Sequence, residues 1–432
     1  MRNQAGTHRA PYRSTTRHAQ AVYPFMADAP LDTRGVVIGR DALDRVARFD
    51  PFRLYEAGRL RGPNMLVLGD IGYGKSSLVK LYLYRQALFG YVPLVTDVKG
   101  EYDRLCAALG VTPIRFVRGG HLRLNPLDPA VAGDARLALL RSIAELLLSR
   151  SLQPREDAAL ELALARLEKV AKRRRQPTIG DVVAHLLRPD PEAAAGLEST
   201  LEDLIEWARD LAFALRRLVT GDLAGLFDTP TSPGLSLDGP IVSIDLSQIP
   251  DQAKPILMAC VATWLRGQWT RADGVRRIVV QEEAWHLLAS PGVAELAQAN
   301  FKLARQYGVQ NILVMHHLGD LRAAGDAGTR TAELAAGLLA DTATRVLYHL
   351  DPGEVRASTD LLGLNQAQRQ VIPQLQRGSG LWLVGPRSYV VHHLLAPSPD
   401  SPEGWIVDTD QAMLGTADPP ESLQPHGAEG WR

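Results

Sequence analysis

The sequence predicts an α/β protein whose mainly parallel sheet is interrupted by an all-helical segment. Short apolar runs alternate with segments of good helix formers near the start of the chain and again in its second half, which is the pattern of strand–helix–strand units. From about residue 130 to residue 226 the strand-like runs stop, and apolar residues recur at helical spacing instead. The 432 residues, 46% hydrophobic and 22% charged, suffice for a sizeable core and exclude disorder or a disulfide scaffold for the chain as a whole.

The first elements of the predicted sheet lie between residues 64 and 117. Asn64–Gly69 is a short apolar run that predicts a buried strand, and Lys75–Leu88 is rich in helix formers and ends before Gly90. The next strand, helix and strand are predicted at Tyr91–Val98, Glu101–Leu109 and Thr112–Val117. Strands that are joined by helices in this way are expected to run parallel.

The helical segment divides the predicted sheet into two parts. Its four predicted helices are Ala135–Leu152, Arg155–Lys172, Thr178–Leu187 and Leu197–Leu218. Strands resume at Pro240–Leu246, Arg277–Gln281, Asn311–Met315, Thr344–Leu350 and Leu381–Gly385. We therefore expect residues 35–129 and 227–413 to form one core, with residues 130–226 as an insertion. A basic flexible tail is predicted at residues 1–34 and a second tail at residues 414–432.

The charges of the chain balance, with 48 Lys and Arg against 48 Asp and Glu. A net charge of zero gives no overall positive field that would attract nucleic acid, so any contact with DNA would come from local patches. Cys106 and Cys260 lie far apart in the sequence and lack metal-ligand spacing, which favours buried, reduced thiols. Every apolar run is shorter than the roughly 18–20 residues that a membrane-spanning helix needs.

One glycine-rich segment has the chemistry of a phosphate-binding loop. Gly69–Ser76 fits the pattern G-x-x-x-x-G-K-[ST], and it follows a predicted strand and opens a predicted helix, which is the context that this pattern requires. Glycines let backbone N–H groups converge on phosphate oxygens, and the N-terminus of a helix adds positive potential. We expect Lys75 to reach the β- and γ-phosphates and the Ser76 hydroxyl to ligate Mg²⁺. The predicted nucleotide-binding residues are Gly69, Gly72, Tyr73, Gly74, Lys75, Ser76 and Ser77.

Two adjacent glutamates follow a later apolar run. Glu282 and Glu283 come directly after the predicted strand Arg277–Gln281. At the end of a buried strand beside a phosphate site, Glu282 is expected to hold Mg²⁺ through a water molecule. Glu283 is expected to orient and deprotonate the attacking water. The alternative is that both glutamates are solvated and simply begin a helix.

Two more polar positions are predicted at strand ends near the loop. His316 follows the strand Asn311–Met315, where a polar residue can sense the γ-phosphate, although a strand-end histidine with a purely structural role fits the pattern equally well. Asp97 ends the second predicted strand, and Gly100 breaks the chain there. Because ligands gather beyond the carboxyl ends of parallel strands, this corner is expected to border the site.

The motifs taken together resemble a known family. The sequence carries, in order, GDIGYGKSS, DVKGEYDRL, RLNPLD, IVSIDLSQI and VVQEEAWHLL. This series resembles the HerA/FtsK superfamily of motor ATPases and is most similar to the TraC-like ATPases of conjugative type IV secretion. The resemblance covers about Gly35 to Asp410, the motor part of such proteins. Glu282 stands where the family's acidic box normally carries Asp, and His316 stands where relatives commonly carry Thr or Gln.

The resemblance implies a RecA-like P-loop NTPase core that binds ATP and Mg²⁺ and hydrolyses the ATP. It also implies a homohexameric ring in which each site is completed by an arginine of the neighbouring subunit, and such an arginine supplies roughly 10³–10⁵ in rate. Arg356 matches the position of this trans arginine, and Arg345 is the alternate. The structural alternative for each is a surface ion pair or a charge that flanks a strand.

Three functions are compatible with these observations. The first is a Mg²⁺-dependent motor of a conjugative or type IV secretion-like DNA transfer system. The second keeps the fold and makes the protein a HerA-like DNA translocase in repair or chromosome processing. The third is a nucleotide-binding assembly factor in which Glu282 has made hydrolysis negligible. The resemblance implies membrane-embedded transfer subunits as partners, with DNA as a further partner, and a location in the cytoplasm or at the inner face of the cell membrane.

Overall fold

The structure is a computed structural model of the chain. It describes residues 29–131, 133–171, 176–191, 194, 199–233, 235, 238–269, 274–288, 291–303, 305–317, 330–394 and 401–407. The predicted tail at residues 414–432 and residues 1–28 of the other predicted tail lie outside these ranges. The folded body begins before residue 35, because Leu31 is only 1% exposed and its carbonyl accepts a hydrogen bond from Arg59 Nη2 at 2.6 Å.

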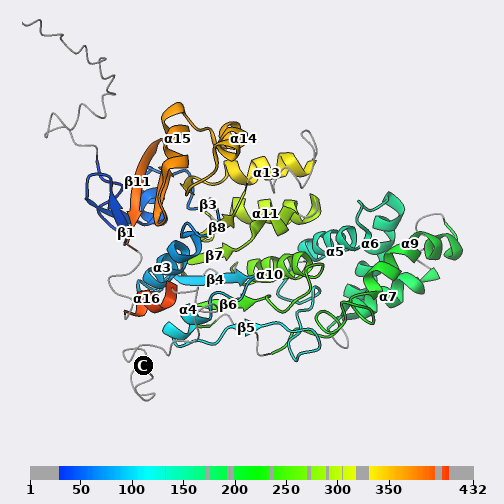
Figure 1. The fold of residues 1–432 in the computed structure, drawn as a ribbon. Helices are drawn as coiled ribbons and strands as arrows, with labels where there is room; N and C mark the ends of the chain where they lie inside the picture. Colours follow the sequence, from blue (N-terminus) through cyan, green and yellow to red (C-terminus); the bar gives the residue numbers. More distant parts are fainter. Residues whose placement is uncertain are drawn as a thin grey trace, which may run out of the picture.

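The described strands form one 11-stranded sheet in the order β2-β1-β11-β10-β9-β3-β8-β7-β4-β6-β5 (Figure 1). Their bounds are β1 Val36–Asp41, β2 Val46–Phe49, β3 Met65–Leu68, β4 Val92–Asp97, β5 Ile114–Arg115, β6 Val242–Asp245, β7 Arg277–Gln281, β8 Val309–Met315, β9 Thr344–Leu347, β10 Ser379–Val384 and β11 Arg387–His393. From β9 to β5 every pairing is parallel, as predicted. The strand β3, which leads into the glycine-rich loop, lies between β8 and β9.

One side of the sheet differs from the prediction. Strands β2, β1, β11 and β10 pair antiparallel with their neighbours, and β10 joins them to β9. Of these, only β10 overlaps a predicted strand. The others are hard to recognise because their apolar runs are short, and in β11 buried residues alternate with more exposed ones from Ser388 to His392. Such alternation is typical of a strand with one exposed face, whereas the predicted strands are continuous apolar runs.

Helices cover both faces of the sheet. Their bounds are α2 Pro51–Glu56, α3 Lys75–Leu88, α4 Asp103–Ala108, α5 Gly133–Leu148, α6 Pro154–Ala171, α7 Ile179–Leu187, α9 Leu201–Arg216, α10 Lys254–Trp269, α11 Pro291–Leu303, α13 Arg330–Ala340, α14 Pro352–Leu362, α15 Gln366–Val371 and α16 Pro402–Val407, with short 3₁₀ helices η1 Ala284–Leu288 and η2 Ile372–Gln374. Met65 and Val67 of β3 join the core cluster that contains residues of α3, α4 and α16, whereas Leu66 and Leu68 join the one beneath α10, α11 and α13. This alternation is the period of two of a strand that is buried on both faces. No described helix has the length and apolarity needed to cross a membrane.

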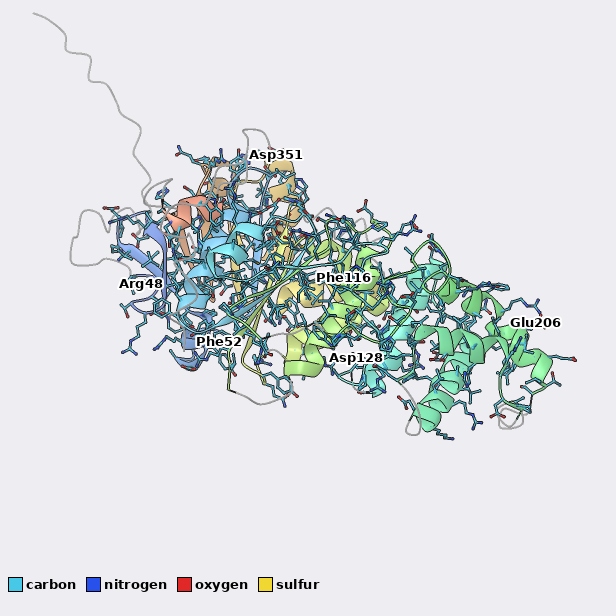
Figure 2. The ribbon with its side chains drawn as sticks, turned by 90° about the horizontal axis from the view of Figure 1, so that it is seen from below. Arg48, Phe52, Phe116, Asp128, Glu206 and Asp351 are labelled. Atoms are coloured by element: carbon cyan, nitrogen blue, oxygen red, sulfur yellow. The ribbon has the colours of Figure 1, made fainter. Side chains whose placement is uncertain are left out.

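The predicted insertion is a helical body to one side of the sheet. Helices α5, α6, α7 and α9 pack on one another, and α5 also contacts α10 and α11 of the sheet layer. Their apolar faces belong to the same buried cluster as the α10 layer, so the body is continuous with the core. Figure 2 places Glu206 of α9 and Arg48 of β2 at opposite ends of the molecule. Capping boxes begin α7 at Thr178 and α9 at Thr200 and fix where these helices start.

A buried amide pair holds together the amino ends of the central strands. The Asn64 Oδ1 atom accepts hydrogen bonds from the Asn311 backbone N–H and from Asn311 Nδ2, both at 3.1 Å. Asn64 Nδ2 donates to the carbonyls of Phe301 and Asp341. Asn64 is 3% exposed and Asn311 2%, so these polar groups are satisfied inside the protein. The pair ties β3 to β8 at the end of the sheet away from the glycine-rich loop.

Candidate active site

The glycine-rich loop connects β3 to α3, as the motif predicts. Three of its glycines have positive φ: Gly69 at +151°, Gly72 at +84° and Gly74 at +103°. A Cβ atom on Gly69 would lie 2.5 Å from the Cβ of Tyr348, so only glycine fits there. Gly74 caps the N-terminus of α3 without a side-chain hydrogen bond. The N–H groups of the first helical turn are therefore directed at the loop, which is the arrangement that binds phosphate oxygens.

The Lys75 ammonium is buried within this loop. The residue is 4% exposed, and its Nζ donates hydrogen bonds to the Gly69 carbonyl and, at 2.8 Å, to the Asp70 carbonyl. Burial lowers the pKa of Lys75 to about 8. Ser76 and Ser77 follow in the first turn of α3 and are both partly exposed. The ammonium is thus held close to the position that a phosphate chain in the loop would take, as the cationic partner that such a ligand needs.

Residues from the end of β9 and the start of β10 hold the loop in place. The Tyr348 hydroxyl donates to the Gly74 carbonyl at 3.2 Å and lies 3.0 Å from Nδ1 of His393, a histidine of β11. The backbone N–H of Gly378 donates to the Tyr73 carbonyl at 3.0 Å. The sequence places Gly378 in a segment, Gly378-Ser379-Gly380, that fits the resemblance, but it does not predict these contacts, because Tyr348 and Gly74 are 274 positions apart.

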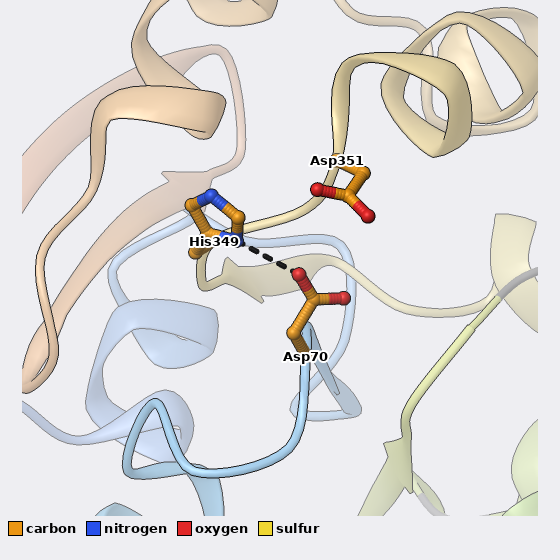
Figure 3. A group of neighbouring side chains, drawn as sticks. All are labelled: Asp70, His349 and Asp351. Atoms are coloured by element: carbon orange, nitrogen blue, oxygen red, sulfur yellow. Dashed lines mark hydrogen bonds and ion pairs between the residues drawn. The ribbon is translucent and has the colours of Figure 1, made fainter.

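A second set of contacts joins the loop to the segment after β9. The His349 carbonyl accepts from the Asp70 backbone N–H at 2.9 Å, and His349 Nδ1 lies 2.8 Å from Asp70 Oδ2. The His349 ring stacks on Tyr73, with ring centroids 4.4 Å apart and planes 7° from parallel. Figure 3 shows Asp351 beside this pair, and one ligand atom from each of Asp70, His349 and Asp351 lies within 4.8 Å of the others. The three residues form a polar cluster between the loop and the segment after β9.

The first glutamate of the acidic pair is buried beside the loop after β4. Glu282 is 8% exposed, and its Oε1 accepts a hydrogen bond from the Tyr102 hydroxyl. Burial raises the pKa of Glu282 to about 7, although the Tyr102 hydrogen bond acts in the opposite direction.

The second glutamate lies in a network of charges. Glu283 Oε1 is 2.5 Å from Lys99 Nζ and 2.9 Å from His316 Nε2, and the Trp285 indole N–H donates to Oε2 at 2.9 Å. Burial acts to raise the pKa of Glu283, but the hydrogen bonds from His316 and Lys99 outweigh it and hold that pKa far below the ordinary carboxyl range. Glu283 has φ +49°, a left-handed conformation that is rare outside glycine. Strained backbone of this kind is frequent at functional sites.

The predicted corner after β4 positions two of these partners. Asp97 Oδ1 accepts hydrogen bonds from the backbone N–H groups of Lys99 at 3.1 Å and Gly100 at 2.8 Å, and Oδ2 accepts from that of Tyr102 at 3.0 Å. Asp97 is 1% exposed, and burial raises its pKa. The carboxylate folds the chain so that Lys99 and Tyr102 both meet the acidic pair. The sequence predicted that this corner borders the site but not that it supplies these two residues.

The order of the strands brings the predicted residues together. Strand β8 lies between β3 and β7, so His316 at its carboxyl end stands between the glycine-rich loop and the acidic pair. His316 Nε2 contacts Glu283 and lies 3.1 Å from Lys99 Nζ. The histidine thus belongs to the acidic site through both of these contacts.

The two arginine candidates lie in different surroundings. Arg356 is exposed on α14 and pairs with no carboxylate among the described residues. Arg345 is opposite Leu66 in the β3–β9 register and points away from the loop, donating to the carbonyls of Leu362 at 2.6 Å and Leu339 at 3.2 Å. Its guanidinium is already bound to its own chain at the amino end of the sheet. Arg356 is thus exposed, whereas the Arg345 guanidinium donates to carbonyls of its own chain.

Comparison with known proteins supports the predicted fold. No protein-family model and no curated protein sequence matches the chain. VirB4 of Thermoanaerobacter pseudethanolicus superposes with a TM-score of 0.71 at 22% identity, over 86% of this chain and 99% of that one. The plasmid coupling protein TrwB in complex with ADP and Mg²⁺ superposes with a TM-score of 0.55 at 13% identity, over 86% and 92%. TrwB in complex with the analogue ADPNP superposes with a TM-score of 0.51 at 14% identity, over 84% of this chain and 95% of that one.

These similarities confirm the predicted fold class. The chain has the mainly parallel P-loop NTPase core of these proteins together with a helical insertion. The predicted resemblance to the conjugation ATPases is likewise confirmed at the level of the fold.

Proposed function

We propose that this chain is a Mg²⁺-dependent ATPase that acts as the motor of a conjugative or type IV secretion-like DNA transfer system. The observation that carries the proposal is the meeting of a phosphate-binding loop, with Lys75 buried in it, and the pair Glu282–Glu283 at one edge of a parallel sheet. The fold shared with VirB4 and with TrwB, which was solved with ADP and Mg²⁺, supports the same assignment.

Nucleotide binding is assigned to the loop and the first turn of α3. The N–H groups around Gly74 and the Lys75 ammonium would bind the β- and γ-phosphates, and Lys75 would exchange the Gly69 and Asp70 carbonyls for phosphate oxygens. The Ser76 hydroxyl and the Glu282 carboxylate are the groups that would hold Mg²⁺. When bound, this ion neutralises charge on the β- and γ-phosphates.

Glu283 is assigned as the group that orients and deprotonates water. In its pairs with Lys99 and His316 the carboxylate is a weak base, because both partners stabilise its anionic form. Release from Lys99 raises the proton affinity of Glu283 and lets a water molecule take the place of Lys99 beside Oε1, which His316 also contacts. The γ-phosphate is an anion that competes for Lys99, so binding of ATP and activation of the base are expected to go together.

The assignment is tested by ATP hydrolysis. Lys75→Ala should abolish turnover, and removal of Mg²⁺ by a chelator should do the same to the unmodified protein. Lys302→Ala serves as the matched control, because Lys302 is an exposed lysine of α11 that donates to Gln298 Oε1 and lies outside the site. Full hydrolysis by Lys75→Ala would overturn the assignment.

A homohexameric ring with Arg356 acting in trans is part of the proposal. The exposed position of Arg356 on α14 leaves it free to reach a neighbouring subunit. Arg356→Ala should lower turnover by about 10³-fold or more while ATP binding is retained. Mixing it with Lys75→Ala subunits should restore part of the activity, because a mixed ring pairs an intact loop with an intact arginine. Failure to complement, with ring assembly demonstrated, would exclude the trans role.

A slow nucleotide-binding assembly factor is the second candidate. The observation that favours it is the buried Glu282 in place of Asp, since burial raises its pKa to about 7 and the ionised form is the Mg²⁺ ligand. Turnover that is negligible with ATP tightly bound would favour this candidate, and ordinary turnover would remove it. If turnover is stimulated by DNA but the protein has no role in transfer, the HerA-like translocase is favoured instead.

The proposed partners follow from the proposed activity. They are membrane-embedded transfer subunits and transported DNA, with the motor at the inner face of the cell membrane. Co-purification with the membrane fraction from cells that carry the transfer genes, and its loss when the membrane subunits are deleted, tests this placement.

A further inference from the structure

A cavity of about 710 Å³ lies at the end of the sheet opposite the phosphate-binding loop. It is bordered by the chain before β3, the start of β9, the turn between β10 and β11, and the start of α15. Its size is within the range of pockets that bind small ligands or a stretch of a polymer. No residue of the proposed ATPase site lines it.

The lining of this cavity is strongly cationic. Arg59, Arg61, Arg345 and Arg387 all contribute to it. Among the described residues that line it, none is acidic and none is aromatic. Since the whole chain has a net charge of zero, this concentration of arginine is local. We call it the arginine pocket.

Two of these arginines have no carboxylate partner within the described residues. Arg345 uses Nη1 and Nη2 on the carbonyls of Leu362 and Leu339, and burial without a counter-ion lowers its pKa. Arg61 is exposed, and its backbone carbonyl accepts a hydrogen bond from Arg305 Nη1 at 3.2 Å. This contact places the guanidinium of Arg305 beside the backbone of Arg61. Arg59, in contrast, forms an ion pair with Asp32, in which Nη1 lies 3.7 Å from Oδ1. An anion in the pocket would therefore meet positive charge that is not already neutralised.

The neutral side chains of the pocket also present donors. Asn365 and Gln368 form the capping box of α15, in which Asn365 Oδ1 accepts from the Gln368 N–H and Gln368 Oε1 accepts from the Asn365 N–H, both at 2.9 Å. The two side-chain acceptors are thereby occupied, and the two amide NH₂ groups remain as donors. Guanidinium and amide donors together match the oxygens of phosphate groups.

We propose that the arginine pocket is a second anion site, which binds a ligand carrying several phosphate groups, either the backbone of a single nucleic-acid strand or a free polyphosphate. Guanidinium groups bind phosphates in a bidentate manner, and the lack of aromatic rings among the lining residues leaves no platform on which bases could stack. Binding is therefore expected to be independent of base sequence and sensitive to salt. The proposal does not rest on ATP hydrolysis, because the pocket and the loop lie at opposite ends of β3.

The test uses the full chain with the Lys75→Ala substitution, so that the loop does not contribute to binding. The probes are a fluorescent oligothymidylate, followed by anisotropy over a range of salt concentrations, and inorganic tripolyphosphate, followed by calorimetry. The double variant Arg61→Gln/Arg387→Gln changes two exposed arginines of the pocket. Arg209→Gln is the matched control, because Arg209 is an exposed arginine of α9 in the helical insertion.

If the ligand is the backbone of a nucleic-acid strand, the double variant should bind oligothymidylate about tenfold more weakly than the protein without these two substitutions. The slope of log K against log salt should then become shallower by about 0.7 for each phosphate group that the protein no longer neutralises. For a free polyphosphate, the double variant should lose tripolyphosphate binding while oligothymidylate binding is unchanged. Either result supports the second anion site and identifies its ligand. If both affinities equal those of the Arg209→Gln control, with thermal unfolding unchanged, the proposal is overturned.

Discussion

The two ends of the central parallel sheet both gather charged side chains, but they arrange the charges differently. At the carboxyl end Lys75 is bound to carbonyls of its own loop, and Lys99 is paired with Glu283. At the amino end Arg61 and Arg345 line a pocket without a carboxylate partner among the described residues. A ligand at the carboxyl end must therefore replace existing contacts of both lysines. At the amino end Arg345 also donates to carbonyls of its own chain, but Arg61 is exposed and has no carboxylate partner among the described residues. The first arrangement suits a site that changes state, and the second suits one that simply holds an anion.

The largest expected effect is at the carboxyl end, on the chemical step. Glu283→Gln removes the proposed base while it keeps the size of the side chain, so turnover should fall by about 10²–10⁴-fold. ATP binding, measured by fluorescence of a labelled nucleotide, should be retained. Glu295→Gln is the control, since Glu295 lies on α11 outside the site. Loss of binding together with turnover would show that Glu283 maintains the loop instead of acting on water.

The next effect concerns the stability of the amino end. Asn64→Ala leaves the buried Asn311 amide and two carbonyls without their partner, so the free energy of unfolding should fall by about 2–3 kcal/mol. Urea unfolding of the wild type, Asn64→Ala, Asn311→Ala and the double variant completes a double-mutant cycle, which measures the coupling energy between the two residues. The double variant should be less destabilised than the sum of the single ones, because the two residues satisfy each other. Strict additivity would mean that the pair does not couple β3 to β8.

A third effect separates crowding from backbone strain in the loop. A Cβ on Gly69 would lie 2.5 Å from the Tyr348 Cβ, whereas a Cβ on Gly72 would have no heavy atom within 4 Å. Both glycines have positive φ, so Gly69→Ala and Gly72→Ala share the conformational cost. Gly69→Ala should be the less stable variant by about 1–3 kcal/mol in thermal unfolding. Equal stability of the two would mean that the loop and Tyr348 can move apart freely.

The smallest effect is that of the Lys99–Glu283 pair on stability. Lys99→Met should lower the free energy of unfolding at pH 7 by about 1 kcal/mol, since Lys99 is half-exposed and solvent screens the pair. The pKa of Glu283 is lowered in the folded protein, so this stabilisation is present above the unfolded carboxyl pKa and is lost as pH falls through the folded value. The difference between variant and wild type should narrow with falling pH, as urea unfolding at several pH values would measure. Lys302→Met is the control, and a difference that is constant with pH would contradict the ion-pair origin.

The sequence patterns identify the residues of the carboxyl end that belong to continuous motifs. The loop, the helix Lys75–Leu88 and the pair Glu282–Glu283 follow from apolar runs and glycine spacing, which act over a few residues. The predicted bounds of the parallel strands are close to the observed ones for the same reason, because buried parallel strands are uninterrupted apolar segments.

The residues that complete the site could not be predicted in this way. Tyr348 and Gly378 reach the loop, and His393 contacts Tyr348, because β9, β10 and β11 follow one another in the sheet from β3. This order is a property of the whole fold. Lys99 belongs to one of the family-like motifs, but its contact with Glu283 depends on β4 pairing with β7. The family resemblance indicates Arg345 as an alternate trans arginine, but it does not indicate that the Arg345 guanidinium donates to the carbonyls of Leu362 and Leu339.

The segment that follows β9 has a mechanical consequence for a ring of such chains. His349 stacks on Tyr73 and binds Asp70, and α14 begins immediately afterwards, capped at Asp351 with Pro352 fixing its first turn. A shift of the loop between nucleotide states would therefore be conveyed through a few rigid residues to the helix that carries Arg356. In the proposed ring, the nucleotide bound to one subunit would thus set the position of the Arg356 that the proposal places at the neighbouring site, and the sites would then hydrolyse ATP one after another.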